Sequence, residues 1–91
     1  MEIGSALSKG SFKDALKILS KLKDIPEENV RRAVSGVFVR KLKYARTYEE
    51  GDKFSRVLDE ISQPIYITGK SAHHVLINYL YKASRVMRKG N

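Results

Sequence analysis

The sequence of 91 residues has no cysteine and no apolar run that approaches the length of a membrane-spanning helix. Without cysteine, the chain has no disulfide and no thiolate metal site, so helix packing or a partner must stabilise it. A helix that crosses a bilayer needs about 20 apolar residues, and the first ten residues lack the pattern of a signal peptide. The sequence therefore predicts a cytoplasmic protein that does not bind or enter a membrane.

Residues suited to catalysis or metal binding are scarce. His73 and His74 are adjacent, and neighbours on a helix point about 100° apart, so they do not easily chelate one ion. No serine lies in a nucleophile elbow, and a chain this short rarely encloses a pocket of several hundred Å³. We therefore expect no metal, no cofactor and no enzymatic activity.

The segment 69–71, Gly-Lys-Ser, follows an apolar run and has the residues that end a phosphate-binding P-loop. The full motif needs a second glycine five positions earlier, and Pro64 occupies that position. Proline has no amide hydrogen to donate to a phosphate, and no parallel strands are predicted around it. Nucleotide hydrolysis is therefore not expected. Lys70 at a helix N-terminus could still hold a nucleic-acid phosphate, although an ordinary cap at Ser71 is the simpler interpretation.

Hydrophobic spacing predicts an all-α protein, either a small bundle or a two-hairpin solenoid of four to five helices, in a single domain of residues 1–91. Ser11 and Thr47 are good N-caps, and each has an acid three residues later. Pro26 suits the first position of a helix. The predicted helices cover residues 11–24, 26–46, 48–62 and 71–88, and residues 2–9 could add a short one.

The predicted helix 26–46 has a broad apolar face and a glycine in its interior. The apolar positions at helical spacing are Val30, Ala33, Val34, Val37, Phe38, Leu42 and Ala45. Gly36 costs roughly 1 kcal/mol relative to alanine in such a position. We therefore expect Gly36 to allow a close crossing with another helix.

The chain is strongly basic, with 18 Lys and Arg against 10 Asp and Glu and a net charge of +8. The charges are segregated, because residues 47–62 hold five acids and two bases and so carry −3, which leaves +11 for the remainder. A basic domain of this kind is typical of nucleic-acid binders. Net charge alone, however, indicates only solubility and non-specific binding. The acidic helix, residues 48–61, could contact a basic protein partner or a second copy of the chain.

Two helices concentrate the basic residues. The segment 39–46, "VRKLKYAR", holds four cations and a tyrosine, and a polar stripe at helical spacing runs along the last helix through His74, Asn78, Tyr81, Arg85 and Arg88. Cations bind phosphates, and aromatic rings stack on unpaired bases. The predicted nucleic-acid-binding residues are Arg31, Arg32, Arg40, Lys43, Arg46, Lys70, Tyr81, Arg85 and Arg88. By contrast, we expect ordinary exposed lysines at Lys13, Lys17, Lys21 and Lys53.

The segment "GSFKDALKILSKLKDIP", residues 10–26, resembles the second-helix half of a tetratricopeptide repeat. Gly10 lies at the turn, Phe12 and Ala15 lie on the inner face, and Pro26 lies near the end. The resemblance implies a concave surface that grips another protein. In shape and charge, the chain also resembles the small helical subunits that line the nucleic-acid path in RNA-guided effector complexes.

The sequence alone favours a non-catalytic helical module that binds DNA or RNA through the phosphate backbone, by itself or as a small subunit of a larger nucleoprotein complex. A helical-repeat protein–protein adaptor is the alternative. Basic residues that converge on one face favour the first function. Basic residues scattered around two stacked hairpins favour the second.

Overall fold

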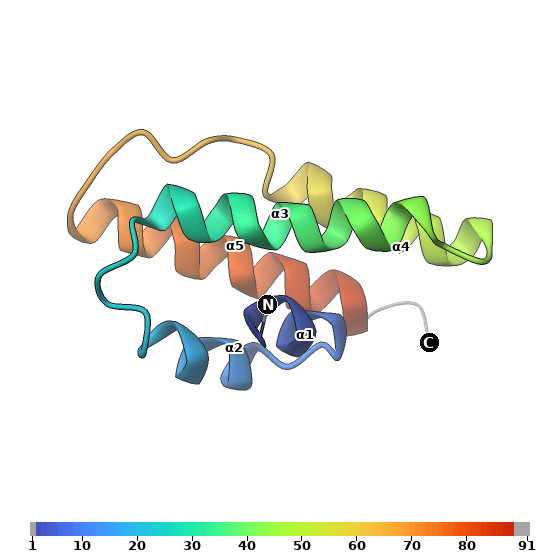
Figure 1. The fold of residues 1–91 in the computed structure, drawn as a ribbon, viewed down its shortest axis with the longest axis horizontal. Helices are drawn as coiled ribbons and strands as arrows, with labels where there is room; N and C mark the ends of the chain where they lie inside the picture. Colours follow the sequence, from blue (N-terminus) through green and yellow to red (C-terminus); the bar gives the residue numbers. More distant parts are fainter. Residues whose placement is uncertain (1, 89–91) are drawn as a thin grey trace.

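The computed structural model describes residues 2–88, and within this range the chain forms five helices and no strand (Figure 1). The helices are α1 (Glu2–Ser8), α2 (Phe12–Leu19), α3 (Glu27–Lys43), α4 (Tyr48–Glu60) and α5 (Lys70–Arg88). Helices α3 and α4 form an antiparallel hairpin whose turn projects past the end of α5, and α1 and α2 lie against the C-terminal half of α5 (Figure 1). The prediction of an all-α fold is confirmed.

All five helices contribute buried side chains to the apolar core. In α3, the buried residues Val30, Val34 and Phe38 recur every fourth position, as a single buried helix face requires. Ala33 is exposed and Leu42 is 36% exposed, although both belong to the predicted apolar face. The predicted face is therefore too wide, because neighbouring helices cover only one side of α3.

Helix α2 ends at Leu19, five residues before the predicted end at residue 24. The hydroxyl of Ser20 donates to the carbonyl oxygen of Lys17 at 2.6 Å, and the amide of Ser20 donates to Leu16. Bonds from a serine side chain to the backbone compete with the continuing helix, and turns carry the chain from there to residue 25. The other observed helix ends lie within three residues of the predicted ones.

The N-caps predicted for α2 and α4 are confirmed. The hydroxyl of Ser11 accepts a hydrogen bond from the amide of Asp14 at 3.2 Å, and that of Thr47 accepts one from the amide of Glu50 at 3.0 Å. The carboxylate of Glu50 in turn accepts from the amide of Arg46 at 3.1 Å. The bonds to Ser11 and Thr47 satisfy amides that the first helical turn leaves without intrahelical partners.

The start of α5 differs from the prediction of a cap at Ser71. The helix begins at Lys70, so Ser71 lies within its first turn. The carbonyl oxygen of Gly69 accepts a hydrogen bond from the amide of His73 at 3.2 Å, and Gly69 has a φ of +77°. Glycine adopts this left-handed conformation without steric cost, which explains its place at the turn.

Two glycines allow close contacts, and Gly36 does not. A Cβ added to Gly4 would lie 2.9 Å from the methyl groups of Val37, so this glycine lets α1 approach α3. A Cβ added to Gly10 would collide with Cγ of Arg88. A Cβ added to Gly36 would meet nothing within 4 Å, so the expected helix crossing at Gly36 is absent among residues 2–88.

Candidate nucleic-acid interface

The residues predicted to bind nucleic acid lie in four separate places. The start of α3 carries Arg31 and Arg32, the hairpin turn region carries Arg40, Lys43 and Arg46, the start of α5 carries Lys70, and the end of α5 carries Tyr81, Arg85 and Arg88. Because a helix rises 1.5 Å per residue, about 27 Å separates the two ends of α5. The four places therefore do not form one continuous cluster, and the predicted residues as a set do not converge on one face of the molecule.

Arg31 is held inside the fold. Its Nε and Nη2 donate to the carboxylate of Glu28 at 2.7 and 2.6 Å, its Nη1 donates to the carbonyl oxygen of Ile61 at 3.1 Å, and its side chain is 11% exposed. The same carboxylate accepts from the amide of Ile65 at 2.7 Å. The Arg31–Glu28 pair thus joins α3 to the chain between α4 and α5, and we leave Arg31 out of the interface.

The Arg31 hydrogen bonds also set the charge state of Glu28. These bonds hold the pKa of Glu28 at about 2, against an ordinary value of 4.5, although partial burial opposes the shift. The pKa of Arg31 is raised for the reciprocal reason. Both groups are therefore ionised at neutral pH, and the pair acts as a structural ion pair.

The starts of α3 and α5 lie at the end of the molecule opposite the α3–α4 turn (Figure 1), and they carry Arg32 and Lys70. The side chain of Arg32 is 75% exposed, and its Nε donates to Glu28 at 3.1 Å. Lys70 is exposed at the start of α5. The fold thus keeps both cations apart from those at the end of α5.

The hairpin turn exposes cations together with acids. Arg40, Lys43 and Arg46 are all exposed, and Tyr44 between them is 75% exposed. The acidic helix α4 starts directly after this segment, so carboxylates lie close to these cations. A phosphate here would meet both signs of charge.

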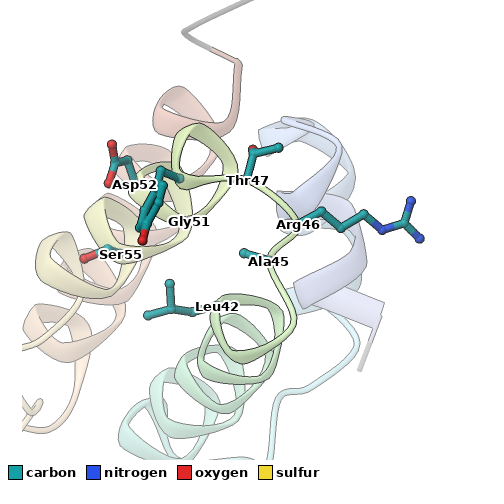
Figure 2. A pocket seen from close by; sticks show the side chains of 8 residues that line it. Leu42, Ala45, Arg46, Thr47, Gly51, Asp52 and Ser55 are labelled. Atoms are coloured by element: carbon teal, nitrogen blue, oxygen red, sulfur yellow. The ribbon is translucent and has the colours of Figure 1, made fainter.

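Figure 2 shows this mixed environment in the groove between α3 and α4. The groove has a volume of about 480 Å³, and both Arg46 and Asp52 line it. The guanidinium of Arg46 points away from Leu42 and Ser55, which lie on opposite sides of the groove (Figure 2). The groove is therefore not a cluster of cations.

The end of α5, by contrast, forms a pocket with cations and no acid. Its volume is about 530 Å³, and its lining includes four cations, two aromatic rings, two serines and a glycine. We call it the basic pocket, with the residues Lys9, Gly10, Ser11, Phe12, Lys13, Tyr81, Ser84, Arg85 and Arg88. Three of the predicted site residues, Tyr81, Arg85 and Arg88, thus share one site.

The turn between α1 and α2 builds one wall of the basic pocket. The amide of Gly10 donates to the carbonyl oxygen of Leu7 and the amide of Ser11 donates to that of Ala6, both at 2.9 Å, while Gly10 has a φ of +74°. This pair of bonds around a left-handed glycine is a Schellman motif, a common way to end a helix. It turns the chain back towards α5, so that Lys9 and Lys13 flank the pocket.

Aromatic side chains form the floor of the basic pocket. The rings of Phe12 and Tyr81 meet edge to face, with centroids 5.3 Å apart and planes at 84°. Tyr81 remains 45% exposed, and the guanidinium carbon of Arg85 lies 5.9 Å from its ring centroid. Contact with Phe12 fixes the tyrosine ring, so a partly exposed aromatic surface lies beside a cation.

Sequence reasoning missed two of the four cations that line the basic pocket. Lys13 is predicted to be an ordinary exposed lysine, and Lys9 does not belong to the predicted site. Both lie far from α5 in the sequence and reach it only through the turn at Gly10. A glycine directly after a short amphipathic helix is the one sequence signal of that turn, because it marks a Schellman cap.

Other features limit what the described part of the chain can hold. Within residues 2–88, no group of three or more His, Cys, Asp or Glu side chains could hold a metal ion, and no helix has the length and apolarity to cross a membrane. Comparisons of the chain with models of protein families, with curated proteins and with solved structures find no match.

Proposed function

We propose that this chain is a non-catalytic nucleic-acid-binding module that holds a sugar–phosphate backbone at the basic pocket. The observation that carries the proposal is the lining of that pocket, with four cations, two rings and no carboxylate. The bound nucleic acid is DNA or RNA, and the chain acts alone or as a small subunit of a nucleoprotein complex.

The charges of the basic pocket favour a polyanion. Lys9, Lys13 and Arg85 line one space of about 530 Å³, and no acid is among the lining residues. Like charges that share one pocket repel one another, and a phosphate between them removes the repulsion. Each neutralised phosphate also releases counterions, which makes the binding sensitive to salt.

The rings of the basic pocket favour a nucleic acid over other polyanions. A phosphate group alone needs cations and hydrogen-bond donors, whereas Tyr81 and Phe12 offer flat apolar surface beside those cations. Bases of a single strand stack on such rings with little dependence on sequence. The pocket thus has cations for the phosphate and aromatic rings for the base of a nucleotide.

Fluorescence anisotropy with labelled single- and double-stranded DNA and RNA across a salt series tests the proposal. We expect the logarithm of the association constant to fall linearly with the logarithm of salt concentration, with a slope of about −2 to −3 for the three phosphate contacts of Lys9, Lys13 and Arg85. A poly-glutamate peptide serves as the matched anionic competitor and should displace the nucleic acid only weakly. Absence of binding at low salt would overturn the proposal.

A protein–protein adaptor is a second candidate, favoured by the exposed apolar residues of the hairpin. Val39 and Leu42 are 46% and 36% exposed, and Tyr48 is 94% exposed. An adaptor should bind its partner without any dependence on nucleic acid. Pull-downs from nuclease-treated and untreated extracts distinguish the two functions, because a partner bound through nucleic acid is lost after nuclease treatment.

A further inference from the structure

The exposed face of α5 runs from the basic pocket to the start of the helix. Residues three or four positions apart lie on the same face of a helix. Tyr81 and Arg85 of the basic pocket belong to such a series, and every member of it is exposed. We call these exposed residues the α5 track: Lys70, His74, Asn78, Tyr81 and Arg85.

The α5 track faces away from the apolar core. Leu76 and Ala83 are buried in the core. Each of them lies two residues from its neighbours in the track, and two residues turn a helix by about 200°. The track is therefore open to solvent from one end of α5 to the other.

Helix α5 and the chain that leads into it carry no acidic side chain, because no Asp or Glu follows Glu60 in the sequence. The hydroxyl of Tyr79 donates to the carbonyl oxygen of Gln63 at 2.9 Å, which places the leading chain beside α5. Lys70 and Arg85, near the two ends of α5, therefore share a surface to which this part of the chain adds no carboxylate.

The first part of the chain is basic on balance. Helices α1 and α2 hold one acid each, Glu2 and Asp14, and both line a groove between these helices that no residue of α5 lines. Residues 2–32, which include the turns after α2 and the start of α3, hold seven cations and five acids. These elements therefore do not reverse the charge of the α5 track.

The acids of α4 that lie beside α5 are on its far side. Glu49 and Glu50 line a pocket together with Met87 of α5. Met87 follows Arg85 by two residues, so it points about 160° away from the α5 track. A polyanion on the track thus does not meet these carboxylates.

The α5 track has the length of a short strand of nucleic acid. Lys70 and Arg85 are 15 residues apart, which is about 22 Å at 1.5 Å per residue. A strand with stacked bases advances about 3.4 Å per nucleotide, so the track spans about six nucleotides. Between the two cations, Asn78 offers hydrogen-bond donors to phosphates, and the ring of His74 offers a surface on which a base can stack.

We propose that a single strand of nucleic acid extends from the basic pocket along the α5 track to Lys70, with a binding length of about six nucleotides. This path rests on the proposed function, because the strand is anchored at the basic pocket. A single strand fits because its unpaired bases can stack on Tyr81 and His74, whereas a duplex keeps its bases paired and stacked inside. An anionic membrane fits less well, since the track has no large aliphatic side chain to insert.

Fluorescence anisotropy with labelled single strands of three, six and nine nucleotides tests this path. We expect the affinity to rise at least about tenfold from three to six nucleotides and less than about threefold from six to nine, because the track ends at Lys70. A duplex of nine base pairs should bind at least about tenfold more weakly than the nine-nucleotide strand. Equal affinity for the duplex, or no rise between three and six nucleotides, would overturn the path.

A pair of matched variants separates the α5 track from the basic pocket. Lys70→Glu combined with Asn78→Glu changes two exposed side chains, and glutamate suits both the first turn and the interior of a helix, so this track variant should fold. It should lower the affinity for the six-nucleotide strand at least about tenfold and change that for the three-nucleotide strand less than about twofold, because the shorter strand stays in the basic pocket.

The control variant combines Ser55→Glu with Arg56→Glu, which makes the same change in net charge at exposed positions of α4. It should lower the affinity for the six-nucleotide strand less than about threefold. Equal losses in the track variant and the control would overturn the path along α5 and leave the proposed function standing. Absence of binding of every oligonucleotide would overturn both.

Discussion

The basic pocket and the groove between α3 and α4 are both lined by charged residues, but they differ in how the signs are arranged. The basic pocket gathers cations from two parts of the chain that are far apart in sequence, with no acid among its lining residues. The groove between α3 and α4 has both Arg46 and Asp52 in its lining, so both signs of charge occur there. A site with cations and no acid suits a polyanion, whereas a site with both signs of charge does not select one.

The largest expected effect separates the two surfaces directly. The double change Lys13→Glu and Arg85→Glu should lower nucleic-acid affinity about 100-fold at low salt and reduce the salt slope by about 2, because two phosphate contacts are lost. The double change Lys43→Glu and Arg46→Glu alters the net charge equally at the hairpin. It should lower the affinity less than about threefold in the same anisotropy experiment. Equal losses for both pairs would mean that net charge alone drives binding.

A change at Glu28 should lower the stability of the protein and leave the nucleic-acid affinity of the basic pocket unchanged. Glu28→Gln leaves Arg31 without its carboxylate, so the free energy of unfolding should fall by about 2 to 3 kcal/mol. Urea unfolding measures this loss, and anisotropy should give an unchanged affinity for the folded variant. A loss below about 0.5 kcal/mol would show that the ion pair contributes little.

The same residue predicts a pH dependence of stability. Because the folded pKa of Glu28 is held at about 2 against an ordinary value of 4.5, the ionised form stabilises the native state. The stabilisation should be complete above pH 4.5 and should fall as the pH drops from 4.5 towards 2. Urea unfolding across this range should show a steeper decline for the wild type than for Glu28→Gln, and parallel curves would contradict the assignment.

A pair of glycine changes tests how the turn supports the basic pocket. Gly10→Ala should lower the free energy of unfolding by about 2 kcal/mol, because φ is +74° and the new methyl group meets Arg88. Gly69 has a similar φ of +77°, but a Cβ added there would meet no atom within 4 Å. Gly69→Ala should therefore lower the free energy of unfolding by only about 1 kcal/mol. Thermal unfolding of both variants measures the difference. Equal losses would mean that Arg88 moves aside freely.

The smallest expected effect is a gain in stability on the hairpin. Gly36→Ala should raise the free energy of unfolding by roughly 0.5 to 1 kcal/mol, because the helix interior favours alanine and a Cβ there meets no other atom. Urea unfolding measures the gain, and nucleic-acid affinity should not change. A destabilised variant would indicate a close contact at Gly36 in the native state.

Local patterns in the sequence predict the helices well because each signal acts within one turn. Ser11 and Thr47 cap their helices as their spacing from an acid predicts, and the buried positions of α3 lie within its predicted apolar face. The predicted end of α2 is wrong because the hydroxyl of Ser20 donates a hydrogen bond to the backbone. The spacing of hydrophobic residues carries no information about such a bond.

The candidate site is harder to predict because it depends on contacts between distant segments. Tyr81, Arg85 and Arg88 follow a helical stripe, so the sequence identifies them together. Lys9 and Lys13 join them only through the left-handed turn at Gly10 and the packing of α1 and α2 on α5. Arg31 looks like its exposed neighbours in sequence, and only the tertiary contacts to Ile61 and Glu28 reveal its structural role.

The most direct test of the central claim is a titration of ¹⁵N-labelled protein with an unlabelled single-stranded oligonucleotide, followed by amide chemical shifts. The account predicts that the largest changes occur at residues 9–13 and 81–88, the two segments that form the basic pocket. Changes confined to the hairpin turn, or no changes at low salt, would contradict it.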